Sequence, residues 1–200
     1  ADMPPFVQKL TSAAKGKSVV FSTEITMDDL AVVADGIGGA IPDQGGFEDL
    51  ETEGPEDLVG EDAPDFKVAL LDGKDFKLSA AQGKKVVVLD FWATWCGPCV
   101  KAMPEVKAAT DALKAKGVVL VAVNQGERPA VINKFLKQRK WGGLTVGLDP
   151  EGEIADQYGV EGIPQTVIID KEGVIREVHV GYGPGLEKRL LRELNEILSE

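Results

Sequence analysis

The chain has 200 residues, of which 44% are hydrophobic and 6% aromatic, enough for one well-cored domain with an extension. Its formal net charge is −11, and the excess lies at the front, because residues 24–65 hold fourteen acidic residues and no Lys or Arg. This acidity disfavours nucleic-acid binding, and no apolar run approaches the roughly eighteen residues of a membrane-spanning helix.

The front of the chain is expected to hold an extension and a linker. Residues 18–25 alternate like a strand, and residues 27–34 have a helical pattern. One strand and one helix cannot bury a core, so we interpret residues 1–41 as the remnant of an upstream domain or as a packed extension. Residues 42–59 are rich in Gly, Pro, Asp and Glu, which is typical of an acidic, flexible linker.

Residues 60–200 are expected to form one domain in which strands and helices alternate. The expected elements are a hairpin of 66–71 and 76–78, a strand at 86–91, a helix over 100–116, a strand at 118–124, a helix over 129–140, a strand at 144–148, a short helix over 152–158, a hairpin of 166–170 and 174–180, and a final helix with an apolar face from 186 to 198. Residues 86–124 then make a right-handed βαβ unit.

The only two cysteines, Cys96 and Cys99, follow the apolar run 86–91 in a Cys-Gly-Pro-Cys turn. A buried parallel strand would present this dithiol at its carboxyl end. The next helix places Cys96 beside free N–H groups and the positive end of the helix dipole, which lowers the pKa of its thiol. Pro98 fits the first helical turn without losing a hydrogen bond. We therefore expect Cys96 to attack a substrate disulfide and the less accessible Cys99 to resolve the mixed disulfide.

Other interpretations of the cysteine pair are weaker. A structural disulfide usually closes a long loop, and this loop is minimal. Structural zinc needs four ligands, whereas the chain offers this pair and the lone His179, which leaves open only a metal shared by two chains. A peroxide-reducing cysteine would need Thr or Ser three residues earlier, where Ala93 precedes Cys96. A disulfide oxidase or isomerase, and a non-enzymatic copper or zinc carrier using the same dithiol, stay open as alternatives.

Three further residues have expected positions near or away from the dithiol. Asp90 lies in an apolar strand, so its carboxylate should be buried with a raised pKa and could accept the proton of Cys99. Trp95 should shield the neighbouring thiolate and offer a flat contact surface. His179 lies in an alternating strand far from the dithiol and is expected on the strand face or the surface, without a role in the site.

Residues 90–99, Asp-Phe-Trp-Ala-Thr-Trp-Cys-Gly-Pro-Cys, resemble the active-site segment of thioredoxin-fold proteins. Residues 158–166, Tyr-Gly-Val-Glu-Gly-Ile-Pro-Gln-Thr, resemble the family loop in which an Ile-Pro bond is cis and faces the dithiol. Pro104 matches the proline that kinks the family's active-site helix. The resemblance implies an α/β thioredoxin fold, with a central mixed β-sheet flanked by helices and an N-terminal hairpin.

The finer resemblance, over about residues 60–198, is to the TlpA-like branch of bacterial extracytoplasmic thiol reductants. It is carried by residues 60–66, Gly-Glu-Asp-Ala-Pro-Asp-Phe, and by residues 121–124, Val-Ala-Val-Asn. It implies the strand-helix insertion of that branch before the Ile-Pro loop. Ala102 stands where some cytochrome-maturation members have glutamate, and Asp90 is kept where they often replace it, which favours a more general reductase.

We therefore predict a thiol–disulfide oxidoreductase that reduces extracytoplasmic client proteins through Cys96 and Cys99, with Asp90 as proton acceptor. The residues expected to contact substrate are Trp95, Gly97, Pro98, Gly162, Ile163 and Pro164, the last three as a backbone edge that an extended peptide could pair with. No metal or other cofactor is expected. The expected partners are disulfide-bearing clients and an upstream dithiol electron donor. We also expect a monomer in the periplasm or cell envelope, with any export signal or anchor absent from this chain.

Overall fold

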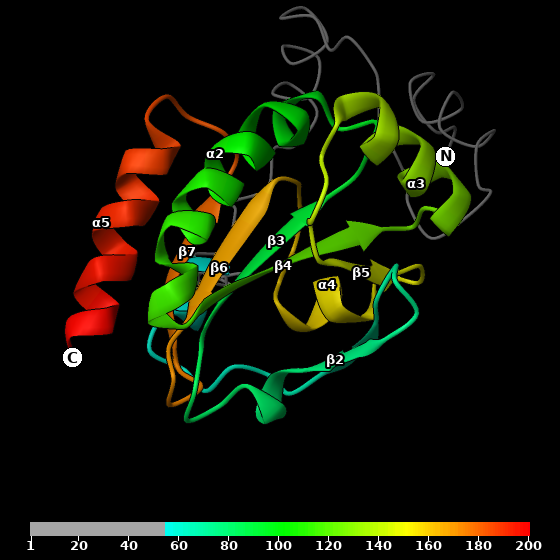
Figure 1. Cartoon of the computed structure of the whole chain (residues 1–200). Coiled ribbons are helices and arrows are strands. Elements are labelled where there is room, and N and C mark those ends of the chain that lie inside the picture. The colour runs from blue at the N-terminus through cyan, green and yellow to red at the C-terminus, as the bar shows by residue number, and fades with distance from the viewer. Residues whose placement is uncertain (1–54) are drawn as a thin grey trace, which may run out of the picture. The chain divides into compact units, whose positions relative to one another are not determined.

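The computed structural model describes residues 55–200, so the extension expected over 1–41 and the linker residues up to 54 lie outside the described residues. The described part has a five-stranded sheet in the order β5-β4-β3-β6-β7 and a separate sheet of β1 and β2 (Figure 1). Its strands are β1 (Lys67–Ala69), β2 (Asp75–Lys77), β3 (Val86–Trp92), β4 (Val118–Gln125), β5 (Val146–Asp149), β6 (Gln165–Ile169) and β7 (Ile175–Val180), and its α-helices are α2 (Gly97–Leu113), α3 (Pro129–Arg139), α4 (Glu153–Gln157) and α5 (Leu186–Ser199).

Strand β3 forms the centre of the main sheet, and all seven of its residues are buried. It pairs in parallel with β4, from Val86 opposite Val118 to Trp92 opposite Asn124, and antiparallel with β6. Strand β5 pairs in parallel with β4 at one edge of the sheet, and β7 pairs antiparallel with β6 at the other edge. A strand covered on both faces needs apolar residues on both faces, which explains the unbroken apolar pattern of β3 and β4. The mixed sheet predicted from the sequence is confirmed.

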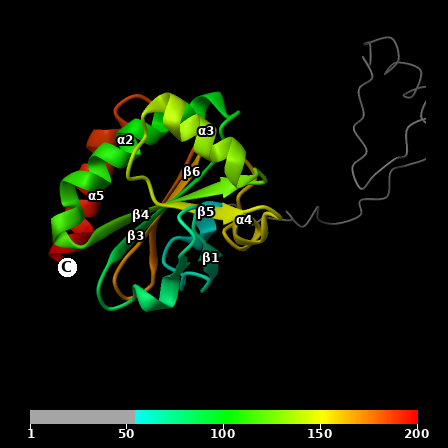
Figure 2. The same ribbon diagram turned by 45° about the vertical axis from the view of Figure 1, so that its right-hand side comes forward.

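Helices α2, α3 and α5 lie on one face of this sheet, and α4 and the β1–β2 hairpin lie on the other (Figure 2). A hydrophobic cluster packs against each face. The first joins the sheet to α2, α3 and α5, through residues such as Met103, Ile132 and Leu190. The second joins the opposite face to the β1–β2 hairpin and α4, through residues such as Val68 and Ile154. A short loop connects the end of β3 to the start of α2, so this loop lies at the carboxyl edge of the sheet, where Ala93 and Cys96 belong to the first cluster.

Several element boundaries differ from the expectation. Helix α3 ends at Arg139 because Lys140 adopts a left-handed conformation, with φ of 58°. Strand β5 covers Val146–Asp149, so it begins two residues later and ends one residue later than the strand expected at 144–148. Within the expected linker, Pro55–Leu58 forms a 3-10 helix, and Leu58 packs against the second cluster. No helix of residues 55–200 combines the length and the apolar character that a membrane crossing requires.

Candidate active site

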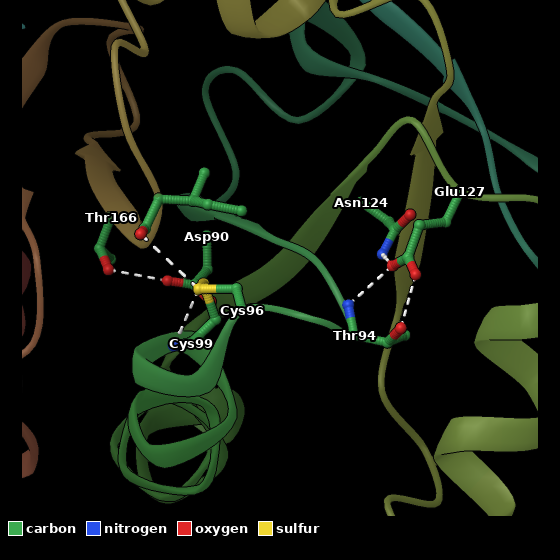
Figure 3. The surroundings of a disulfide bond; sticks show 8 residues. Asp90, Thr94, Cys96, Cys99, Asn124, Glu127 and Thr166 are labelled. Atoms are coloured by element: carbon green, nitrogen blue, oxygen red, sulfur yellow. Dashed lines mark hydrogen bonds between the residues drawn. A yellow bond between two sulfur atoms is a disulfide. The ribbon is translucent and has the colours of Figure 1, made fainter. Parts of the chain in front are cut away.

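Cys96 and Cys99 form a disulfide bond at the start of α2 (Figure 3). Cys96 is the N-cap residue, and its Sγ accepts a hydrogen bond of 3.2 Å from the backbone N–H of Cys99. The N–H groups of a helix N-terminus and the helix dipole stabilise negative charge on a sulfur at this position. Cys96 is 5% exposed and Cys99 is fully buried. In the reduced protein Cys96 would therefore be the sulfur that a substrate reaches first.

The loop before β6 closes the site from the other side. The Ile163–Pro164 peptide bond is cis, and the carbonyl oxygen of Ile163 lies 3.6 Å from the Sγ of Cys96. Pro164 is buried, and its own carbonyl oxygen accepts a hydrogen bond of 2.7 Å from the N–H of Gly181. The structure thus brings together two segments that are 67 residues apart in the sequence. The Ile163 carbonyl faces the dithiol, while Gly181 fixes the loop at Pro164.

Asp90 is fully buried in β3, as the sequence predicted. It occupies the same face of the sheet as Val88 and Trp92, which pack in the first cluster together with Cys99. The hydroxyl of Thr166, directly opposite in β6, donates a hydrogen bond of 2.8 Å to Oδ1 of Asp90. Burial raises the pKa of Asp90 to about 7, and the Thr166 hydrogen bond opposes this rise by favouring the charged form. A carboxyl group with this pKa can take up or release a proton near neutral pH.

The outer rim of the site is exposed. Trp95 is 71% exposed, although tryptophan is usually well buried, and Gly97, Pro98 and Gly162 are also exposed. Trp95 directly precedes the N-cap cysteine in the chain, so an exposed aromatic residue borders the position that a substrate would approach. A large exposed aromatic side chain next to a reactive group supplies apolar contact area for a partner protein.

Sequence reasoning missed a second group of residues beside the disulfide. Glu127 accepts hydrogen bonds from Thr94 and from Asn124, and none of these three was expected in the site (Figure 3). A signal was present, since β3 and β4 are parallel and adjacent. Residues that follow their carboxyl ends must therefore meet at one edge of the sheet.

His179 lies on β7, as expected, directly opposite Thr166 of β6. Its Nε2 lies 2.8 Å from Oε2 of Glu193 on α5, and this pair ties the edge strand to the last helix. Glu177, His179 and Glu193 are the one group of three residues within 55–200 whose side chains could together hold a metal ion. That group includes neither cysteine.

Comparison with known proteins identifies the family to which this chain belongs. Residues 59–178 match the model of the AhpC/TSA family. Among curated proteins, the thiol-disulfide oxidoreductase ResA of Bacillus thuringiensis is 40% identical over 121 residues, which cover 60% of this chain and 69% of that protein.

Solved structures agree with this match. A Chlorobium tepidum structure described as thiol:disulfide interchange protein DsbE has a TM-score of 0.64 at 38% identity and covers 70% of this chain and 97% of its own. The exposed lipoprotein thioredoxin Etrx1 of Streptococcus pneumoniae has a TM-score of 0.58 at 31% identity and covers 66% and 99%. These similarities confirm the predicted thioredoxin-like fold.

Proposed function

The chain belongs to the AhpC/TSA family and is a ResA-like thiol–disulfide oxidoreductase, and from this premise we propose that it reduces disulfides of client proteins, with Cys96 as nucleophile and Cys99 as resolving thiol. The observation that carries the proposal is the unequal placement of the two sulfurs. Cys96 is at the helix N-cap beside exposed Trp95, whereas Cys99 is fully buried on the sheet face that carries Asp90.

The chemistry follows from this placement. The Cys96 thiolate attacks one sulfur of a client disulfide, forms a mixed disulfide and releases the other client sulfur as a thiolate. Asp90 accepts the proton of the Cys99 thiol, and the Cys99 thiolate attacks the Cys96 sulfur. The Cys96–Cys99 disulfide forms, the second client thiolate leaves, and two electrons have passed to the client. An upstream dithiol must then return two electrons to the protein.

The proposal also includes the cellular location of the protein and the direction in which it transfers electrons. A solved relative is described as an exposed lipoprotein, which supports an extracytoplasmic site of action for this chain. The Gly97-Pro98 dipeptide and the buried Asp90 resemble the reducing members of the thioredoxin-fold proteins, which favours reduction over oxidation. Ala93, three residues before Cys96, supports thiol–disulfide exchange over peroxide reduction.

Trapping of the mixed disulfide tests the assigned roles. Because the buried Cys99 resolves the intermediate, Cys99→Ser should accumulate covalent adducts with a model client such as insulin, whereas Cys96→Ser should form almost none. The adducts are counted on non-reducing gels after acid quenching, with the double variant as background. Equal trapping by both single variants, or no insulin reduction by the wild-type protein, would contradict the proposal.

A further inference from the structure

Glu127 makes a dense set of hydrogen bonds beside the disulfide (Figure 3). Its Oε2 accepts a hydrogen bond of 2.7 Å from the backbone N–H of Thr94 and one of 2.9 Å from Nδ2 of Asn124. Its Oε1 accepts a short hydrogen bond from the Thr94 hydroxyl. Hydrogen bonds to an ionised carboxylate are shorter and stronger than neutral ones, so three donors on one carboxylate make a firm connection.

The register of the sheet explains why these residues meet. Trp92, the last residue of β3, lies opposite Asn124 in β4, and β4 ends one residue later, at Gln125. Thr94 and Glu127 each lie two residues beyond the end of their strands. Parallel strands end at the same edge, so the loop before α2 and the loop before α3 are adjacent there. Glu127 joins the two loops.

The loop that Glu127 holds is the one that presents the reactive cysteine. Only Ala93, Thr94 and Trp95 lie between the end of β3 and the N-cap residue Cys96. The Cys96 N–H donates to the Ala93 carbonyl over 3.2 Å, so the backbone turns sharply around Thr94. Trp95 is 71% exposed, so little of its side chain packs on the domain. The Thr94–Glu127 contact is thus the tertiary connection nearest to Trp95 on its N-terminal side.

We propose that Glu127 is a positioning residue: acting through Thr94, it fixes the segment from Ala93 to Trp95 and so presents the Trp95 ring and the Cys96 sulfur to a client protein. This role rests on the proposed client reduction. Glu127 itself does not touch the reacting sulfurs in this arrangement. Its loss should leave the dithiol able to react but poorly oriented toward a large partner.

The test compares a protein substrate with a small one. Second-order rate constants of the reduced protein are measured with insulin and with hydroxyethyl disulfide, which is too small to use the Trp95 surface. For Glu127→Ala we expect a fall of about tenfold with insulin and less than about twofold with the small disulfide, the size expected for losing charge-assisted hydrogen bonds. Glu151→Ala is the matched control, because Glu151 is exposed and follows β5 at the same edge of the sheet.

Variants of Thr94 make the test independent of how Glu127→Ala folds. Thr94→Val removes the hydroxyl donor and should lower the insulin rate, whereas Thr94→Ser keeps the donor and should restore it. The double variant that combines Thr94→Val with Glu127→Ala should reduce insulin no more slowly than Glu127→Ala alone. Equal falls for both substrates, or an unchanged insulin rate in Glu127→Ala, would overturn the positioning role. Failure of the wild-type protein to reduce insulin would instead overturn the proposed function.

Discussion

The hydroxyl of Thr166 donates a 2.8 Å hydrogen bond to Oδ1 of Asp90, while Oδ2 of the same buried carboxylate has no hydrogen-bond partner among the residues that the structure describes. A buried carboxylate with one satisfied oxygen is poorly stabilised as an anion, because the lost solvation is only partly replaced. Burial accordingly raises the pKa of Asp90 to about 7. In the proposed mechanism, Oδ2 is the oxygen of Asp90 that remains free to accept the proton of Cys99.

Asp90→Asn should slow the resolving step near neutral pH, because asparagine cannot accept the proton of Cys99. The defect should shrink as the pH rises and Cys99 ionises without help. The measurement is a pH–rate profile for release of a client from the preformed mixed disulfide with Cys96. An unchanged profile would mean that water or another residue accepts the proton.

The same substitution should stabilise the folded protein at neutral pH. The folded-state pKa of Asp90 lies above its ordinary value of 3.8, so the folded protein binds the proton more tightly than the unfolded chain does. The free energy of unfolding therefore falls as the pH rises from about 4 to about 7 and then levels off. Since one pKa unit corresponds to about 1.4 kcal/mol, Asp90→Asn should gain a few kcal/mol at pH 7 and almost nothing near pH 3.

Thr166→Val supplies the matched control for both experiments. It removes the hydrogen bond that favours the charged carboxylate, so the pKa of Asp90 should rise further. The pH range in which stability falls should extend upward in this variant. Denaturant unfolding of the oxidised proteins across pH 3–9 measures both effects. A pH dependence unchanged from that of the wild type in both variants would show that Asp90 does not titrate as described.

Substitution of Trp95 should impair client reduction without changing stability, whereas substitution of Trp141 should lower stability. Trp95→Ala removes an exposed ring, so it should change the unfolding free energy by less than about 0.5 kcal/mol while lowering the rate with insulin. Trp141 packs against Trp92 and Phe135, with ring centroids 6.0 and 5.6 Å apart. Trp141 is half-buried, so Trp141→Ala should cost about 1–3 kcal/mol. A stability loss in Trp95→Ala as large as that in Trp141→Ala would contradict the contact role.

The midpoint potential should be that of a reductant. The Gly97-Pro98 dipeptide and Asp90 resemble the reducing members of the thioredoxin-fold proteins, so we expect a value nearer thioredoxin, roughly −270 mV, than the strong oxidant DsbA, about −120 mV. Equilibration in dithiothreitol redox buffers, read by thiol labelling of Cys96 and Cys99, gives the value. A potential above about −180 mV would place the protein with oxidases or isomerases.

Deleting residues 1–54 should leave the cooperative unfolding transition and the rate with hydroxyethyl disulfide unchanged. Among residues 55–200, helices and the β1–β2 hairpin already cover both faces of the main sheet through the two clusters, in which Leu58 is the first described residue. A deletion of residues 1–62 serves as the comparison, because it also removes Leu58 and the 2.8 Å hydrogen bond from Gly60 N–H to the Ile175 carbonyl. It should lower the unfolding free energy by about 1–2 kcal/mol. Loss of cooperativity in the shorter deletion would show that residues 1–54 belong to the core.

Local patterns were sufficient to predict the elements and the reactive pair. The apolar run of β3 marks a strand buried on both faces, and the Cys-Gly-Pro-Cys turn marks a helix start with a dithiol at its cap. Both signals come from neighbouring residues, because burial of a strand and capping of a helix depend on side chains a few positions apart. The elements and the reactive cysteines could therefore be predicted, and the burial of Asp90 followed from its apolar neighbours. The thioredoxin fold itself was implied by the resemblance of residues 90–99 and 158–166 to that family.

Contacts between distant segments could not be predicted in this way. Thr94 and Glu127 are 33 residues apart, and their hydrogen bonds were not expected. Cys96 and Ile163 are 67 residues apart, and only the family resemblance indicated that the Ile163–Pro164 loop would face the dithiol. Their meeting depends on the register in which β4 and β6 pair with β3, and a shift of one residue would turn each side chain to the other face. The amino-acid sequence thus indicates which residues carry the thiol chemistry. The packing of the strands sets which carboxylate holds the reactive loop and which carbonyl faces the sulfur.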